Sequence, residues 1–406
     1  MNAVSPISKA NAIQGLQVVD SDTHITEPHD LWTSRVSEKF KTKVPHVKMG
    51  PKGRPHWYIN DDQILQKKVG AASVIRKDGS KQSFWEWDIR SGLTFDEVNP
   101  ASYDAKARVQ FMDEQGVAAQ IGYGNILGFG AHQLAKIDPE VALMTIQVYN
   151  DAMAELQQES GNRLYPQCLV PFWDVKASVK EAERCARDLK LRGITICPEP
   201  HDNPDLHPLH HESWDPLWEA VSDLDLPINF HVGSGESSLE AWASATWPGM
   251  DNQRKLVIGN SQLELYNARI LANLLTCDLL PRFPKTKWVL VESGLCWIPF
   301  IIERLEWQLL DTPFEGKSLD QPSPRELFQR QVYSCFWFEQ AAPNRLLDII
   351  GFDNVMFETD FPHATCLYPN GVEHALEQLK PWGEDVQRKV MGGNAARLYN
   401  LDLPAA

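Results

Sequence analysis

The sequence predicts an α/β protein built on a (β/α)8 TIM barrel, and two features carry this prediction. Short apolar stretches alternate with longer amphipathic stretches along most of the 406 residues, which favours βα units and a parallel sheet. Eight of the apolar stretches are candidate strands, the number that such a barrel requires. No apolar run approaches the roughly 18 residues of a membrane span.

Each predicted strand precedes a polar loop. The predicted strands cover residues 16–20, 118–123, 165–170, 193–197, 226–230, 287–291, 332–337 and 354–357. The helices between them are expected near 103–115, over 138–160, 176–191 and 262–280, from Asp215, and over 298–310. Asp138 precedes a proline and an acid, a pattern typical of a helix N-cap. Trp297 and Phe300 lie at helical spacing and are predicted to be buried.

Residues 30–100 interrupt the alternation and form a long insertion after the first strand. This stretch is rich in Pro, Gly, Lys and aromatic residues, among them Trp57, Trp85 and Trp87. An insertion of this length is commonly functional, for example a cover over a site. The alternative, that its tryptophans only fasten it to the barrel, is equally open. We expect residues 1–406 to form a single domain, because about 200–250 residues already make one barrel.

The charge and cysteine content exclude some classes of partner. A net charge of −15 argues against nucleic acid or an anionic membrane as the main partner and leaves a small-molecule substrate. An anionic substrate remains compatible, because a bound cation can dominate a local field. Seven scattered cysteines without a C-x-x-C pair indicate reduced thiols of a cytoplasmic protein. Residues 1–14 lack the basic and apolar regions of a signal peptide.

Acidic and imidazole side chains follow several of the predicted strands. Asp22 and His24 follow the first strand, and residues two apart on a strand face the same side. His231 follows the fifth strand, Glu292 the sixth and Asp360 the eighth. Since the carboxyl ends of barrel strands surround one mouth, we expect these side chains to converge. Two imidazoles and two carboxylates form a ligand set for Zn²⁺ or Mn²⁺.

In combination these motifs resemble the amidohydrolase superfamily, and within it the branch of aminocarboxymuconate semialdehyde decarboxylase and the hydroxybenzoate decarboxylases. The resemblance covers residues 18–401 and implies one divalent metal ion, Zn²⁺ in the first place and Mn²⁺ in the second. It implies the ligands Asp22, His24, His231 and Asp360. Residues 193–199 contain no lysine for a bridging carboxylate, which favours a single metal. The motifs that carry the resemblance are Asp22-Thr23-His24-Ile25-Thr26-Glu27-Pro28, Asn229-Phe230-His231, Phe283-Pro284, Glu292-Ser293-Gly294, Thr359-Asp360-Phe361-Pro362-His363 and Asn394-Ala395-Ala396-Arg397-Leu398-Tyr399.

Glu292 departs from the family pattern, because the decarboxylases typically have a histidine at the end of strand six. Three roles are open for Glu292: an acid/base with a pKa raised by burial, a metal ligand, or a group that orients a neighbour. Asp360, Glu292 and His231 are the candidate catalytic residues. The resemblance implies non-oxidative decarboxylation of an aromatic or ring-derived carboxylic acid, as part of aromatic compound catabolism. The alternative is a hydrolase that uses a metal-activated water on an amide, ester or C–C bond.

A third hypothesis is a barrel that binds a ligand without turnover. We also expect a homo-oligomer, most simply a dimer. Glu27 either holds an imidazole N–H beside the metal or structures the Glu-Pro turn. His363 either faces the substrate or bonds to the backbone of its loop. Arg90 is one of several arginines that could hold a substrate carboxylate. The remaining histidines of interest are predicted to lie in a solvated loop: His201, His207, His210 and His211.

Overall fold

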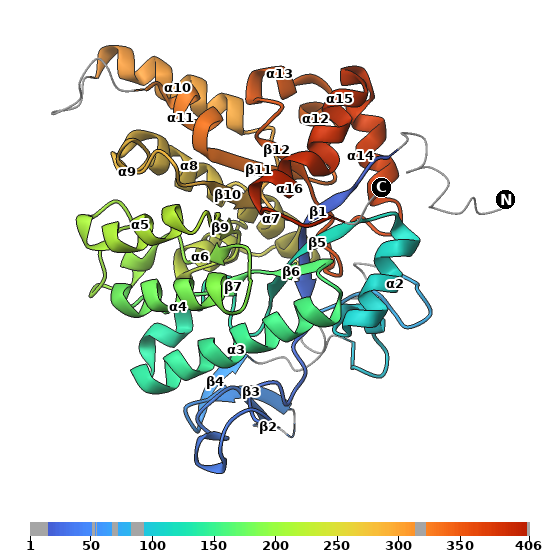
Figure 1. The fold of residues 1–406 in the computed structure, drawn as a ribbon, viewed down its shortest axis with the longest axis vertical. Helices are drawn as coiled ribbons and strands as arrows, with labels where there is room; N and C mark the ends of the chain where they lie inside the picture. Colours follow the sequence, from blue (N-terminus) through green and yellow to red (C-terminus); the bar gives the residue numbers. More distant parts are fainter. Residues whose placement is uncertain are drawn as a thin grey trace.

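Parallel strands lie in the middle of the molecule, with helices arranged around them (Figure 1). The computed structural model describes residues 15–50, 53, 55–66, 72–82, 93–312 and 322–403. One parallel sheet has the order β12(Val355–Phe357)-β11(Val332–Phe336)-β10(Trp288–Val291)-β9(Ile228–His231)-β8(Ile194–Thr195)-β7(Cys168–Leu169). A second has the order β1(Val19–Ile25)-β5(Ala119–Gly124)-β6(Leu164–Pro166).

The two sheets meet at two places, where β6 is followed by β7 and where β1 lies beside the segment after β12. Between β6 and β7 only Gln167 intervenes, so the predicted third strand is present as two short pieces. At the other end, His24 N donates to Phe361 O at 2.6 Å and Asp360 N donates to Asp22 O at 3.0 Å. Every predicted strand is therefore found, and the predicted α/β class is confirmed. Within each of the two sheets, the strands lie in chain order.

The first strand is longer than predicted. The apolar pattern ends at Asp20, but β1 continues to Ile25, and all of its residues are buried. The continuation carries Asp22 and His24, whose side chains are polar because they face a site. A hydrophobic pattern cannot detect a strand segment of this kind.

The helices that surround the sheets mostly agree with the predicted ones. Asp138 caps α3 as predicted, accepting hydrogen bonds from Glu140 N and Val141 N. Two helices after β9 were not predicted, α6(Glu236–Ser244) and α7(Asn252–Glu264). No helix of the described residues is long and apolar enough to cross a membrane. The main surrounding helices are α2(Ala105–Gln115), α3(Pro139–Glu159), α4(Val175–Arg187), α5(Asp215–Asp223), α8(Tyr266–Thr276), α10(Ile298–Asp311), α11(Pro324–Gln331) and α14(Gly371–Leu379).

The prediction for α10 was wrong at one residue. Ile298 and Ile302 face the core, whereas Phe300 is 67% exposed and Trp297 is half-buried. Positions 298 and 302 are four apart and share a face, so Phe300 points away from that face. Helical spacing alone does not decide which face of a helix is covered.

The insertion contains a small antiparallel sheet that was not predicted, β2(His46–Met49)-β3(Pro55–Ile59)-β4(Gln63–Gln66). Trp57 of β3 is 1% exposed and meets Trp32 edge-on, with 5.8 Å between ring centroids. Both rings belong to an apolar cluster that includes Ile25 and residues of α3. For Trp57 the fastening role is therefore observed. Trp85, Trp87 and Arg90 lie outside the described residues.

Candidate metal centre

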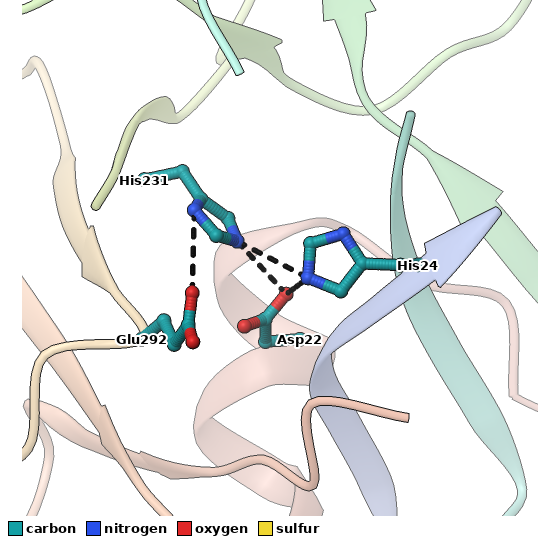
Figure 2. A group of neighbouring side chains, drawn as sticks. All are labelled: Asp22, His24, His231 and Glu292. Carbon is teal, nitrogen blue, oxygen red and sulfur yellow. Dashed lines mark hydrogen bonds and ion pairs between the residues drawn. The ribbon is translucent and has the colours of Figure 1, made fainter. Parts of the chain in front are cut away.

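Four of the side chains predicted from the sequence converge at the carboxyl ends of the strands (Figure 2). Asp22 and His24 project from β1 and His231 from the end of β9. The two histidine Nε2 atoms are 3.3 Å apart, and Asp22 Oδ1 is 3.5 Å from each of them. Glu292, after β10, lies farther out, with its Oε2 3.7 Å from His231 Nδ1.

Asp360, the fifth predicted residue, joins this group from the segment after β12. Its Oδ1 atom is 3.1 Å from His24 Nε2. Adjacent ligand atoms about 2.0–2.2 Å from a common ion lie about 2.8–3.6 Å from one another in tetrahedral or octahedral geometry. The separations of 3.1, 3.3 and 3.5 Å fall in this range. His24 Nε2 therefore lies at ligand spacing from Asp22, His231 and Asp360. Two groups that could hold a cation share His24: Asp22, His24, His231 and Glu292 form one, and His24, Asp360 and His363 form the other.

The hydrogen bonding of the group also fits a divalent cation. Asp22 is 0% exposed, and neither of its carboxylate oxygens has a hydrogen-bond partner. Such buried unpaired acceptors cost about 1–3 kcal/mol each, and more when charged. His231 Nδ1 lies 2.7 Å from Val232 O, so Nδ1 carries the proton and Nε2 presents its lone pair to Asp22 and His24. A cation among these atoms would satisfy all of them.

The pKa shifts follow from burial and from the mixture of charges. Burial lowers the pKa of His24 well below its ordinary value, which favours the neutral imidazole that binds metals. Burial raises the pKa of Asp22. Burial also opposes the ionisation of Asp360, but the contacts of this carboxylate with His363 and His24 outweigh burial and lower its pKa.

Glu292 differs from the other members of the group. Burial raises its pKa well above the ordinary value, and the charges of Asp360 and Asp22 add to this effect. Its side chain is 15% exposed, and its backbone has a left-handed φ of +52°, a strained conformation for glutamate. Its backbone N donates to Glu358 Oε2 at 3.3 Å. Burial and the neighbouring carboxylates thus both favour the protonated form of Glu292, which lies at the edge of the centre.

Glu27 does not contact an imidazole N–H, so its predicted role beside the metal is not observed. Its Oε1 accepts hydrogen bonds from Asn125 N at 2.8 Å and from Ile126 N at 3.0 Å. Burial raises the pKa of Glu27 to about 7. Glu27 therefore holds the loop after β5 through these two hydrogen bonds.

His363 lies in the centre rather than against the backbone of its loop. Its ring stacks on that of His24, with 3.6 Å between centroids. Its Nδ1 lies 2.9 Å from Asp360 Oδ1, and its Nε2 lies 2.8 Å from Asn125 Oδ1. With a side chain that is 21% exposed, His363 forms part of the wall between the candidate ligands and solvent.

The sequence reasoning missed two residues of this wall, both in the loop after β5. Phe129 stacks on His231 with 3.7 Å between ring centroids, and Asn125 bonds to His363. The available signal was the glycine-rich stretch from Gly122 to Gly130. The predicted solvated histidines take no part in the described metal-binding groups; His207 and His211 stack on each other instead.

These observations define an α/β protein whose parallel strands end in a buried group of histidines and carboxylates suited to a divalent cation. A family model described as "Amidohydrolase" matches residues 19–401. The chain belongs to this family, and the resemblance stated from its motifs is confirmed. The expectation of an enzyme of this superfamily is confirmed with it.

Three curated relatives are similar over most of their length. 2-Amino-3-carboxymuconate-6-semialdehyde decarboxylase of Dictyostelium discoideum is 23% identical over 77% of this chain and 80% of its own. Gamma-resorcylate decarboxylase of a Polaromonas species is 25% identical over 73% of this chain and 87% of its own. 2-Keto-4-carboxy-3-hexenedioate hydratase of a Sphingobium species is 23% identical over 95% and 96%.

Three solved structures share the fold. An amidohydrolase from Mycobacterium avium subsp. paratuberculosis is 20% identical, with a TM-score of 0.71 over 95% of this chain and 98% of its own. 5-Carboxyvanillate decarboxylase from Sphingomonas paucimobilis is 21% identical, with a TM-score of 0.60 over 95% and 99%. Dihydroxybenzoic acid decarboxylase from Polaromonas, solved with bound manganese and 2-nitroresorcinol, is 18% identical, with a TM-score of 0.58 over 96% and 98%.

Proposed function

We propose that this enzyme is a metal-dependent, non-oxidative decarboxylase of an aromatic or ring-derived carboxylic acid. In the proposal, a single (β/α)8 domain holds one divalent cation through Asp22, His24, His231 and Asp360. The observation that carries it is the convergence of two histidine Nε2 atoms with buried carboxylate oxygens at 3.1–3.5 Å, beside Glu292, whose pKa is raised by burial. The names of two curated relatives and of two structural neighbours support the reaction type.

For the cation, Mn²⁺ and Zn²⁺ are the two candidates. Zn²⁺ was the first choice from the sequence and stays a prediction. The manganese in the dihydroxybenzoic acid decarboxylase supports Mn²⁺. A donor set with as many carboxylates as imidazoles also suits Mn²⁺, because carboxylate ligands favour harder cations.

The proposed mechanism uses Glu292 as a proton donor. A bound cation would polarise the substrate's carboxylate or an adjacent hydroxyl. Glu292 transfers its carboxylic proton to the ring carbon that bears the carboxylate. The bond from this carbon to the carboxylate then breaks, CO₂ leaves, its bonding electron pair returns to the ring, and solvent restores the proton on Glu292. His231 keeps Nε2 directed at the centre through its Nδ1 contact with Val232 O, and His363 holds Asp360.

The second candidate is addition of water, either in hydrolysis or in hydration. The hydratase relative, which covers 95% of this chain, supports it. Glu292 or Asp360 would then accept a proton from water, which requires an ionised carboxylate. For Glu292 the raised pKa opposes this role and favours proton donation.

A panel of hydroxybenzoates and ring-cleavage acids, offered to the Mn²⁺-loaded and Zn²⁺-loaded enzyme in ¹⁸O-water, tests the proposal. Release of CO₂ without ¹⁸O in the organic product supports decarboxylation. The appearance of ¹⁸O in the organic product, with no CO₂, would show that the enzyme adds water instead. Absence of both reactions in protein that has bound no metal, even after reconstitution, contradicts both candidates.

We also propose a homodimer formed through the outer face of α10. Phe300 and Trp307 on this face are 67% and 64% exposed. Glu303 and Arg304 lie between them in the sequence and are also exposed. Antiparallel packing on a second copy would place Phe300 against Trp307 and Glu303 against Arg304, twice by symmetry. A cytoplasmic location stays a prediction from the reduced cysteines.

A further inference from the structure

A buried chain of hydrogen bonds connects the two segments that carry His24 and Asp360. It begins at Thr359, the residue before Asp360. Thr359 donates to Asp20 twice, from its N to Oδ1 at 2.8 Å and from its Oγ1 to Oδ2 at 2.6 Å. Gln120 of β5 donates from Nε2 to Asp20 Oδ2 at 3.3 Å. Asp20 therefore holds the end of β12 to β1 and β5.

The chain continues from Gln120 to the backbone of His24. Gln120 Oε1 accepts a hydrogen bond from Arg108 Nη1 at 3.1 Å, and Arg108 Nη2 donates to His24 O at 2.5 Å. Arg108 belongs to α2, and its Nε donates to Ala101 O. Its guanidinium also lies over the ring of Phe361, 4.8 Å from the centroid. Arg108 thus contacts both segments, β1 at His24 and the segment after β12 at Phe361.

The members of this network are shielded from solvent. Asp20, Arg108 and Gln120 are each 1% exposed. A buried arginine and a buried aspartate are costly unless each has partners. Their presence beside the centre, where apolar side chains would also fill the space, indicates that their hydrogen bonds have a use.

The backbone of Asp360 shows where such a use is needed. Its φ is +60°, a left-handed conformation that surrounding contacts must hold in place. Thr359 is held on its N–H and on its side chain, directly before this residue. On the other segment, the carbonyl of His24 is held by Arg108. The network therefore acts on the positions of two candidate ligands without touching their ligand atoms.

We propose that Asp20, Arg108, Gln120 and Thr359 are positioning residues that set the spacing of His24 and Asp360 and thereby the affinity for the cation. The inference rests on the metal centre proposed above. Groups that orient metal ligands typically change affinity about 10–100-fold when they are removed. The network predicts an effect of this size from side chains that never contact the cation.

The test compares two threonines that differ in network membership. Thr359→Val removes the Oγ1 hydrogen bond to Asp20 and the one that Oγ1 accepts from Phe361 N at 3.2 Å. Thr23→Val removes a hydrogen bond of 2.8 Å to Ile121 O. Thr23 is also buried and lies between Asp22 and His24, so it is a matched control. Metal-free proteins are titrated with Mn²⁺, and free Mn²⁺ is followed by electron paramagnetic resonance. We expect Thr359→Val to weaken binding about 10–100-fold and Thr23→Val or Thr359→Ser to change it less than about threefold.

Two further measurements keep the outcome clear. The zero-field splitting of bound Mn²⁺ should change in Thr359→Val and not in Thr23→Val, because it reports ligand geometry rather than stability. If Thr359→Val does not fold, Gln120→Met, which cuts the link between Arg108 and Asp20, takes its place. Equal affinities for the network variant and the control would overturn the network alone. A wild-type protein that binds no Mn²⁺ would overturn the proposed metal centre and the network with it.

Discussion

The two sides of the metal centre are built differently. On the side of β1 and β12, hydrogen bonds surround the candidate ligands: Asp360 N donates to Asp22 O, Thr365 donates to Asp360 Oδ2, and His24 N donates to Phe361 O. On the side of β10, Glu292 N donates to Glu358 Oε2 at 3.3 Å, and the partly exposed Glu292 side chain lies 3.7 Å from His231 Nδ1.

This structural difference corresponds to two chemical roles, metal binding and proton transfer. Ligands of a metal ion need fixed positions, because misplacing them weakens binding. A residue that passes a proton to a substrate must reach the reacting atom and exchange with solvent afterwards. The side of β1 and β12, which we call the held side, therefore suits metal binding. The side of β10, which carries Glu292, suits proton transfer.

The largest effect should come from the held side. His24→Ala removes an imidazole that contacts both Asp22 and Asp360, and we expect the bound metal to fall from about one ion per chain to nearly none. Activity should fall by more than about 10³-fold with it. Elemental analysis after dialysis measures the metal. His207→Ala, in the solvated loop, is the matched control and should keep both, and metal retention by His24→Ala would break the comparison.

A smaller effect, on the pH dependence of stability, should come from Glu27, which accepts hydrogen bonds from the loop after β5. The pKa of Glu27 is raised by burial from 4.5 to about 7, so the folded state binds its proton more tightly than the unfolded state. Its contribution to stability is therefore complete below pH 4.5 and is lost as the pH rises to about 7. Glu27→Gln keeps an acceptor for Asn125 N and Ile126 N but cannot ionise.

The difference in unfolding free energy between wild type and Glu27→Gln should consequently change by up to about 3 kcal/mol over this pH range. Denaturant unfolding at several pH values measures it. A difference that does not vary with pH would show that Glu27 ionises normally in the folded protein.

Substitutions on the outer face of α10 should have the smallest effect on the metal centre, because this face takes no part in metal binding or proton transfer. Arg304→Glu places two acidic residues next to each other and should weaken the dimer at least about tenfold. The double variant Glu303→Arg with Arg304→Glu should restore the dimer, because the reciprocal pairs form again with reversed charges. Sedimentation velocity measures the assembly. A dimer that is insensitive to both variants, or a monomeric wild type, would place no interface on α10.

The sequence predicted which side chains converge better than it predicted the contacts around them, for a physical reason. Asp22, His24, His231 and Asp360 follow or end apolar strands, and parallel strands bring such ends together whatever the details of packing. Arg108 and Thr359 could not be assigned a role, since their use depends on contacts across 84 residues to His24 and 339 residues to Asp20.

The fold shows the same limit. Strands buried among apolar neighbours have a clear pattern and were predicted. Helices α6 and α7 were missed because each buries little: Ser238 is the buried residue of α6 and Gly259 that of α7. Phe300 was assigned to the core because an exposed apolar side chain on a helix has the same sequence pattern as a buried one.

Glu292→Gln provides the most direct test of the difference between the two sides. The amide keeps the size of the side chain and removes the proton that the mechanism uses. With an active substrate, we expect turnover to fall about 10²–10⁴-fold while the metal content of the same preparation stays at that of wild type. A parallel loss of metal and turnover would make Glu292 a ligand, and unchanged turnover would remove it from the reaction; either result would contradict the account.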